Sequence, residues 1–318
     1  MLLATLSYLF AGTVLIWISA QRLETYSVAT ARFYGISPFL IGATVIAFAT
    51  SAPEMLTSFF AARENKGSMV VGNVIGSNVA NIALVFGLTL GILSFKKETI
   101  FTPKNIKPNL LILILSSFLI CLIVANRPFS IFSSLVLLCF FVGVIFYWYK
   151  RKEVINVEKN VNEEKFLLFK LIFTLLILIL AAWFITKGAL GVLEKWELEE
   201  LFVGYTVLAI GTSLPEIAAS IALALKGRHE TVAGTIIGSN IFNSLLVLAI
   251  PGFFNRELEM ATSWDFMVWR PLLLVLLLVT ILFCTYIFSL INKQKQGSLL
   301  LVFIFLSCYL ASLALAYK

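Results

Sequence analysis

The sequence predicts an all-α integral membrane protein with ten transmembrane helices arranged as two inverted five-helix repeats. Three observations carry this prediction. The 318 residues are 60% hydrophobic and only 13% charged, with a mean hydropathy of +0.98. The apolar residues form long runs joined mostly by short polar segments. Residues 42–87 also align without a gap to residues 204–249.

The composition excludes an ordinary soluble domain, which is about half apolar and a quarter charged. The surplus apolar surface is expected to face lipid. The net charge of +7 does not indicate nucleic-acid binding, because the basic residues lie between apolar runs rather than in one patch. The four cysteines lie inside apolar runs without metal or disulfide spacing, and we expect them to pack as small apolar residues. The N-terminal run lacks a basic n-region and is close to full span length, so we expect a retained first span.

The apolar runs give ten expected spans. Their limits are 2–20, 37–62, 69–93, 109–125, 129–149, 166–187, 201–225, 231–253, 268–290 and 298–316. The charged segment between them predicts three parts: a first five-helix repeat at 1–149, a cytoplasmic linker at 150–165 and a second five-helix repeat at 166–318.

The loop charges predict the orientation. With the N-terminus outside, 16 of the 24 Lys and Arg residues fall in cytoplasmic loops or the linker. The positive-inside rule therefore favours both termini outside a prokaryotic plasma membrane.

The two halves share polar residues that chance does not explain. At a constant offset of 162, 19 of the 46 aligned positions are identical. The matched residues include Pro53 with Pro215, Glu54 with Glu216, and Asn81 with Asn243. Five spans per repeat make the second repeat enter the membrane from the opposite side, an arrangement that many secondary transporters use.

Glu54 and Glu216 are the two acidic residues of the sequence that fall deep inside apolar spans. A carboxylate at that depth is costly unless it is protonated, paired or bound to a cation. No Lys, Arg or His lies at a matching depth in any predicted span. Protonation or a bound cation is therefore expected.

A proline precedes each glutamate, in Thr-Ser-Ala-Pro-Glu at 50–54 and Thr-Ser-Leu-Pro-Glu at 212–216. Proline leaves the carbonyl four residues earlier without its helical partner. A cation can satisfy such a carbonyl, and the hydroxyls of Thr50, Ser51, Thr212 and Ser213 add further oxygen atoms. The alternative is a kink that serves packing alone.

A second repeated motif is Gly-Ser-Asn-x-x-Asn, at 76–81 and 238–243. Ser77 and Asn81, and likewise Ser239 and Asn243, are four residues apart and face one side of a helix. Glycines at 72, 76, 234 and 238 are expected to permit close helix approach.

These groups are all hard oxygen donors, which suit calcium, sodium or magnesium rather than zinc or copper. A flexible, carbonyl-rich site favours calcium and sodium over magnesium, which demands tight octahedral geometry. Two carboxylates neutralise one divalent ion, and they can equally hold monovalent ions or protons.

The two motif pairs resemble those of the cation/calcium exchanger superfamily, specifically its prokaryotic sodium/calcium exchangers, over the whole chain. The resemblance implies that Glu54 and Glu216 bind both calcium and sodium, and that the carbonyls of Thr50 and Thr212 complete the calcium position. It implies sodium positions lined by Ser51, Ser213, Ser77, Ser239 and the carbonyls of Ala47 and Ala209, with Asn81 and Asn243 in the middle. It also implies that the first and sixth spans slide past the rest.

Some relatives, including the potassium-dependent exchangers, carry Asp where this chain has Asn243. The neutral amide predicts that the protein has no strong potassium requirement.

We therefore predict a secondary antiporter that exchanges calcium for sodium by alternating access, rather than an enzyme. The alternatives are a proton/calcium exchanger that uses the same glutamates and, less favoured by the internal inverted symmetry, a cation channel. The expected partners are calcium and sodium ions and the lipid bilayer. No cofactor and no obligate protein partner are expected, since the internal repeat makes a monomer sufficient.

Overall fold

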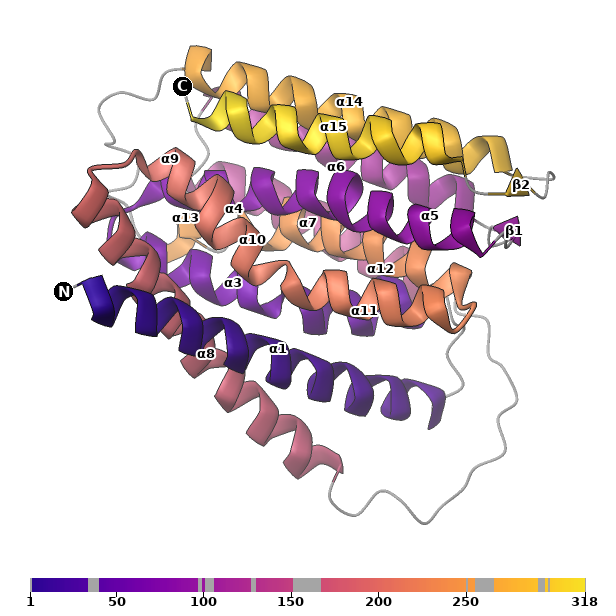
Figure 1. Ribbon diagram of the computed structural model, residues 1–318, viewed down its shortest axis with the longest axis horizontal. Coiled ribbons are helices and arrows are strands. Elements are labelled where there is room, and N and C mark those ends of the chain that lie inside the picture. The colour runs from indigo at the N-terminus through magenta and orange to yellow at the C-terminus, as the bar shows by residue number, and fades with distance from the viewer. Residues whose placement is uncertain are drawn as a thin grey trace.

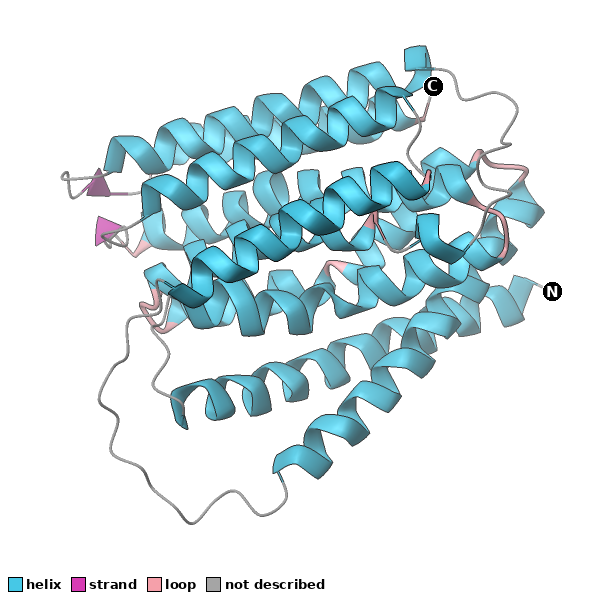
Figure 2. Ribbon diagram, turned by 180° about the vertical axis from the view of Figure 1, so that it is seen from behind, coloured by secondary structure: helices cyan, strands magenta, loops and turns pink. Residues whose placement is uncertain are grey.

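The structure, a computed structural model, describes residues 2–33, 40–96, 99–100, 106–126, 130–150, 167–249, 251–254, 266–290, 295–296 and 298–317. Helices make up nearly all of this part of the chain (Figure 2). The predicted cytoplasmic linker lies outside the described residues, apart from Lys150 at the end of a helix.

The helices and the strand of the first half follow in this order: α1 (Leu2–Phe33), η1 (Ile41–Ile46), α3 (Ala47–Arg63), α4 (Gly67–Val79), η2 (Ala80–Val85), α5 (Phe86–Phe95), β1 (Thr99–Ile100), α6 (Ile106–Asn126) and α7 (Ile131–Lys150). The elements η1 and η2 are π-helical turns that run directly into α3 and α5. Such turns inside α-helices are rare and occur frequently at functional sites.

The second half contains α8 (Leu167–Trp196), α9 (Glu200–Val203), η4 (Gly204–Leu208), α10 (Ala209–Thr212), α11 (Leu214–Leu225), α12 (His229–Phe242), η5 (Asn243–Val247), α13 (Pro251–Phe254), α14 (Phe266–Leu290), β2 (Lys295–Gln296) and α15 (Leu299–Ala316). The π-helical turns η4 and η5 lie at the positions that correspond to η1 and η2 in the sequence alignment. The unusual helix geometry is therefore repeated together with the polar motifs.

By length and composition, eight described helices are able to cross a membrane, or nine when the bent pair α9–α10 and α11 counts as one span. The first predicted span contributes a shorter apolar stretch, Leu3–Ser19, so the tenth span stays a prediction. Two helices run past the limits expected for their spans: α1 continues beyond residue 20 to Phe33, and α8 continues beyond residue 187 to Trp196. The charge of Lys187 does not end α8, because its side chain reaches Glu64 while Ala189 and Leu190 beyond it are buried.

The two proline motifs adopt different backbone conformations. Helix α3 passes through Pro53 without interruption. In the second half the helix breaks at Ser213, between α10 and α11, and the two parts are bent by 41°. Gly211 occupies the position of Ala49, and glycine is the poorer helix former of the two.

The bundle has a two-helix edge and a thicker remainder (Figure 1). Helices α1 and α8 pack on each other at one edge, where Gly188 lies against Leu9 and Gly191 against Thr5. Helices α6, α14 and α15 lie toward the opposite edge, and α3, α4, α11 and α12 lie between. Both chain ends lie at the same end of the bundle, at the left in Figure 1, whereas the antiparallel pair β1–β2 lies at the other end.

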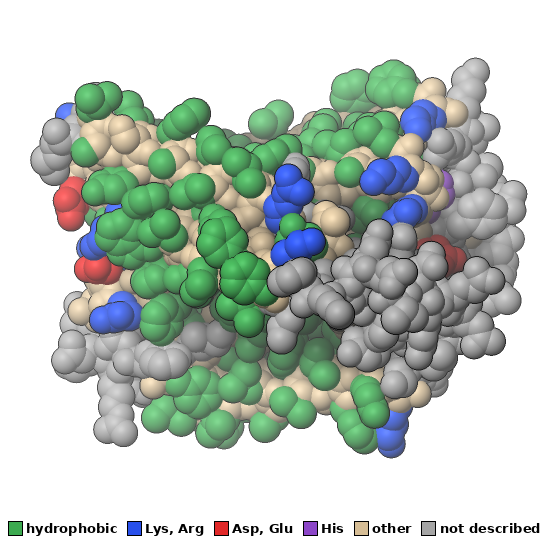
Figure 3. Space-filling view, turned by 90° about the horizontal axis from the view of Figure 1, so that it is seen from below, with side chains coloured by type: hydrophobic (Ala, Val, Ile, Leu, Met, Phe, Trp, Pro, Cys, Tyr) green, Lys and Arg blue, Asp and Glu red, His purple; other side chains and the backbone are tan. Residues whose placement is uncertain are grey.

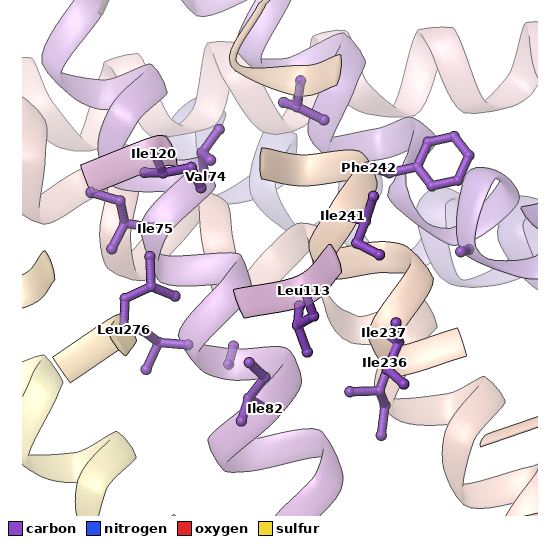
Figure 4. Close-up of a cluster of buried hydrophobic side chains, with 14 of the residues drawn as sticks. Val74, Ile75, Ile82, Leu113, Ile120, Ile236, Ile237, Ile241, Phe242 and Leu276 are labelled. Carbon is purple, nitrogen blue, oxygen red and sulfur yellow. The ribbon is translucent and has the colours of Figure 1, made fainter. Parts of the chain in front are cut away.

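Apolar side chains fill the interior and also cover much of the surface. Residues of α4, α6, α12 and α14 meet in the buried cluster of Figure 4, with Ile75, Leu113, Ile237 and Leu276 among its members. On the face seen in Figure 3, hydrophobic side chains are exposed over wide areas. A bundle that is apolar both inside and outside fits the lipid environment that the composition predicts.

Candidate cation site

The glycines of both halves bring the central helices into backbone contact. A Cβ atom at Gly42 would overlap the carbonyl of Thr231 on α12, and one at Gly204 would overlap the carbonyl of Met69 on α4. One at Gly76 would lie 2.6 Å from the carbonyl of Tyr205. The packing role predicted for Gly72, Gly76 and Gly238 is confirmed, because each faces backbone of the opposite half.

Glu54 of α3 and Glu216 of α11 are both buried, with 0% and 2% of their surface exposed. Each accepts a hydrogen bond from the serine of the other half. Ser51 donates to Oε1 of Glu216 and Ser213 donates to Oε1 of Glu54, both at 3.3 Å. Ser51 is aligned with Ser213, and Glu54 with Glu216, so each bond is the counterpart of the other in the repeat. The two halves therefore form one crossed arrangement around the pair of carboxylates.

The threonine hydroxyls of the two motifs are crossed between the halves in the same way. Thr212 lies beside Glu54, and Thr50 lies beside Glu216. Thr50 also approaches Ser239 of α12, with 3.4 Å between the two hydroxyl oxygens. The remaining hydrogen bonds of the threonines run within their own helices, from Thr50 to the carbonyl of Ile46 and from Thr212 to that of Leu208. The sequence motif thus places both threonines and both serines around the two carboxylates.

The other predicted ligands are buried on elements that border this pair. Asn81 lies on η2, which contacts α11, and Asn243 lies on η5, which contacts α3. The backbones of Ala47 and Ala209 are held against α12 and α4, since a Cβ at Gly238 or Gly76 would lie 2.7 or 2.8 Å from their methyl groups. Ser77 follows Gly76 on α4, with its hydroxyl fully buried. All twelve residues predicted from the sequence are therefore in the interior.

Many of these buried polar atoms have no hydrogen-bond partner among the described residues. They are Oε2 of Glu54, Oε2 of Glu216, Oγ of Ser77, and both amide atoms of Asn81 and of Asn243. Leaving one such group unsatisfied costs about 1–3 kcal/mol, and more for a charged group. The number of unsatisfied polar atoms in this one region indicates that the residues are arranged to bind a ligand that is positively charged or that forms several hydrogen bonds.

The donor set is chemically uniform. No cluster of three or more His, Cys, Asp or Glu residues is found in the described part of the chain. Within the same residues, neither buried glutamate has an ion-pair partner, since the two described ion pairs join Lys66 to Glu200 and Lys187 to Glu64. Carboxylate, hydroxyl and amide oxygens suit hard cations such as calcium and sodium. These residues fit such a cation as a transported substrate.

The residues around the site are shut off from solvent in this conformation. A crevice beside the site has about 170 Å³ of empty space and reaches Ser51. Its other walls are apolar: Phe48, Ala52, Met55, Phe242, Leu246 and Val247. In this crevice, Ser51 is therefore the one lining residue that offers a polar side chain to a cation.

Two polar residues inside the Gly-Ser-Asn-x-x-Asn motifs received no role in the sequence interpretation. Asn78 and Asn240 are matched between the halves and are 0% and 1% exposed. The structure shows that Asn78 donates to Ser244 and Asn240 to the carbonyl of Ile236. Their match in the repeat was the available signal, but it did not distinguish a ligand from a residue that holds helices together.

Comparison with known proteins agrees with this geometry. The family model described as sodium/calcium exchanger protein matches residues 4–150 and 165–318. The putative antiporter CaxA of Alkalimonas amylolytica is 33% identical over 261 residues, which cover 79% of this chain and 80% of that protein. The sodium/calcium exchanger MaX1 of Methanosarcina acetivorans is 24% identical, with 86% and 88% covered.

A solved structure has the same overall fold. The sodium-calcium exchanger NCX_Mj, soaked with Na⁺ and Sr²⁺, superposes with a TM-score of 0.72 at 29% identity, and 99% of each chain is covered. The match by the family model over nearly the whole sequence, together with the paired buried glutamates, shows that this chain belongs to the sodium/calcium exchanger family.

Proposed function

We propose that this protein exchanges calcium for sodium across the membrane at one site shared by Glu54 and Glu216. The observation that carries the proposal is the crossed pair of buried carboxylates, each held by the serine of the other half and each with a second oxygen that lacks a partner among the described residues. Two carboxylates neutralise one calcium ion or two sodium ions. Competition for the same charges is what couples the two ions.

We infer the individual ligand roles from the family resemblance, and the geometry supports them. Glu54 and Glu216 hold calcium with the carbonyls of Thr50 and Thr212. Sodium positions lie on either side, lined by Ser51, Ser213, Ser77, Ser239 and the carbonyls of Ala47 and Ala209. Asn81 and Asn243 complete the middle. The burial of all twelve residues and the crossed hydrogen bonds support this assignment.

Transport requires that the closed site opens to each side of the membrane in turn. We propose that α1 and α8 move together as one unit against the remaining helices. Their close packing at Gly188 and Gly191 and their place at the edge of the bundle support this assignment. The solved structure of NCX_Mj is described in terms of extracellular ion exchange and binding-site occlusion, which supports the same cycle here.

The proposed architecture is a pair of inverted five-helix repeats with both termini outside the plasma membrane. The two chain ends at one end of the bundle support an even number of crossings. The contacts that exchange under the offset of 162 support the internal symmetry. One chain contains both halves of the site, so we propose that a monomer is sufficient and that no cofactor takes part.

A proton/calcium exchanger is the second candidate, favoured by the same two glutamates. Buried carboxylates without a basic partner are able to carry protons as well as sodium. Calcium needs the surrounding hydroxyl oxygens in either case, so it is membership of the sodium/calcium exchanger family that favours sodium as the driving ion.

The test is calcium flux in sealed vesicles that contain the purified protein. One set of vesicles receives an outward sodium gradient and the other receives an outward proton gradient of equal size. Calcium uptake driven by sodium and not by protons is expected. Uptake driven by the proton gradient alone would assign the second candidate, and uptake that does not saturate with calcium would indicate a channel.

A further inference from the structure

Asn78 and Ser244 join the two halves, and each is the chain neighbour of a predicted cation ligand, Ser77 and Asn243 respectively. Nδ2 of Asn78, on α4, donates to Oγ of Ser244, on η5, at 3.0 Å. This bond is shorter than either crossed bond to a glutamate, each 3.3 Å. Both side chains are fully buried.

The hydrogen bonding continues from Ser244 into the backbone of the neighbouring helix. Oγ of Ser244 donates to the carbonyl of Asn240 at 2.6 Å. The side chain of Asn240 in turn donates from Nδ2 to the carbonyl of Ile236 at 2.7 Å. A chain of hydrogen bonds thus runs from α4 through the start of η5 into α12.

Asn243 is the chain neighbour of Ser244, but its side chain forms no hydrogen bond within the described residues. Neither its Oδ1 nor its Nδ2 has a hydrogen-bond partner among the described residues, although the side chain is 0% exposed. No side-chain bond in this part of the chain therefore fixes where the Asn243 amide points. The backbone of η5 has to do so, and the first side-chain anchor of that backbone after Asn243 is Ser244.

The other half has no such anchor. The residue that corresponds to Ser244 is Ile82, next to Asn81, and its side chain cannot form a hydrogen bond. The π-helical turns η2 and η5 are otherwise placed alike. The anchored asparagine is therefore a specific feature of the second half rather than a requirement of the turn.

We propose that Asn78 and Ser244 are positioning residues that hold η5 so that the amide of Asn243 faces the shared cation site, and that they thereby set its calcium affinity. This inference rests on the proposed function. Neither residue has to touch the ion, because the effect is transmitted through the backbone of Ser244 to its neighbour.

The experiment uses the full-length protein in detergent and in vesicles. Ser244→Ala and Asn78→Leu each remove one partner of the bond, and the double variant removes both. Ser244→Thr keeps the hydroxyl and serves as the conservative variant. Ser116→Ala is the matched control, since Ser116 is also fully buried and donates to a backbone carbonyl, that of Leu113 at 2.9 Å, but in α6.

Two quantities are measured for each variant: the calcium concentration that gives half-maximal uptake, and the rise in melting temperature on adding calcium without sodium. We expect Ser244→Ala and Asn78→Leu each to raise the half-saturating calcium concentration by about two- to tenfold, the range for one hydrogen bond. Ser244→Ala also removes the bond from Ser244 to the carbonyl of Asn240. The double variant should therefore have no larger effect than Ser244→Ala alone, because the bond between Asn78 and Ser244 is already lost there. Ser244→Thr should restore the affinity, and Ser116→Ala should leave it unchanged.

A purely structural role gives a different pattern. Variants that lower the melting temperature without calcium but keep the wild-type half-saturating concentration would overturn the inference, as would additive effects in the double variant. Failure of the proposed function is separately visible, since the wild-type protein would then show neither calcium-dependent stabilisation nor sodium-driven uptake.

Discussion

At the scale of single residues, the two glutamates dominate because they are buried, charged at neutral pH unless a proton or cation neutralises them, and without a basic partner in the described chain. A carboxylate in an apolar interior is stabilised mainly by the cation or proton that it binds. Its removal is therefore expected to affect binding more than folding, in contrast to the loss of an apolar core residue.

Replacing either glutamate by its amide tests this expectation. Glu54→Gln and Glu216→Gln should each abolish calcium uptake while the protein still folds and inserts, since the shape of the side chain is kept and a buried charge is lost. Uptake in vesicles and the melting temperature are the measurements, and the exposed Glu194→Gln is the control. Near-normal uptake by either buried variant would contradict a shared site.

Asn243 governs a second prediction at this scale. Its neutral amide leaves the site with two carboxylates and no third charge, so calcium uptake should not require potassium. Uptake measured with potassium replaced by choline should stay close to its rate in potassium. Asn243→Asp adds one negative charge, and this variant should show a larger response to potassium than the wild type. A strict potassium requirement of the unmodified protein would refute the prediction.

At the scale of helices, the two halves are held together by backbone contacts that side chains cannot replace. The contact of η4 with α4 at Gly204 leaves no room for a methyl group, because the carbonyl of Met69 already fills that position. Backbone on both sides of the contact cannot move away as the tip of a flexible side chain could. The polar site depends on this approach, since α4 also carries Ser77.

Gly204→Ala should accordingly destabilise the protein by about 1–3 kcal/mol or more, seen as a lower melting temperature in detergent and a smaller folded fraction. Gly143→Ala is the matched control, because Gly143 lies in α7 with no atom within 4 Å of the added methyl group. That variant should melt no lower than the wild type, since alanine is the better helix former. Equal stability of the two variants would show that the crossing tolerates more space than the structure has.

At the scale of the whole molecule, the α1–α8 unit is linked to the rest by a polar contact at its surface. Lys187 of α8 lies 3.0 Å from Glu64, at the turn that follows α3. Both side chains are partly exposed, so this ion pair contributes at most about 1 kcal/mol to stability. So weak a link is compatible with movement of α8 past the turn.

A covalent link at this position should therefore stop transport. Cysteines introduced as Glu64→Cys and Lys187→Cys, in a protein whose four native cysteines are replaced by alanine, are joined with a short bifunctional maleimide. Calcium uptake should fall with the fraction cross-linked. The control pair is Lys96→Cys with Leu225→Cys, where Nζ of Lys96 lies 3.0 Å from the carbonyl of Leu225 and joins α5 to α11. Both helices belong to the part that we propose stays fixed, so cross-linking there should leave uptake intact. Full activity of the cross-linked 64–187 pair would rule out sliding of α8 against this turn.

The sequence by itself determined the membrane character of the protein, most of the helix limits, and the family, because these depend on apolar run length and on residue types repeated at a fixed offset. It also indicated Glu54 and Glu216, since an acidic residue inside a long apolar run can be recognised from the order of the residues. The crossed bonds Ser51–Glu216 and Ser213–Glu54 join residues more than 150 positions apart, so only the tertiary structure decided them.

The break at Ser213 against the unbroken α3 was not predicted, because both segments carry the same proline and the difference between Ala49 and Gly211 is too small by itself to decide between a kink and a break. The same holds for the contact of Asn78 with Ser244. A matched asparagine indicates that a polar group is needed at that position, but the distance to its partner is set by how two helices cross. Local chemistry follows from the order of the residues, whereas the meeting of distant groups follows from packing.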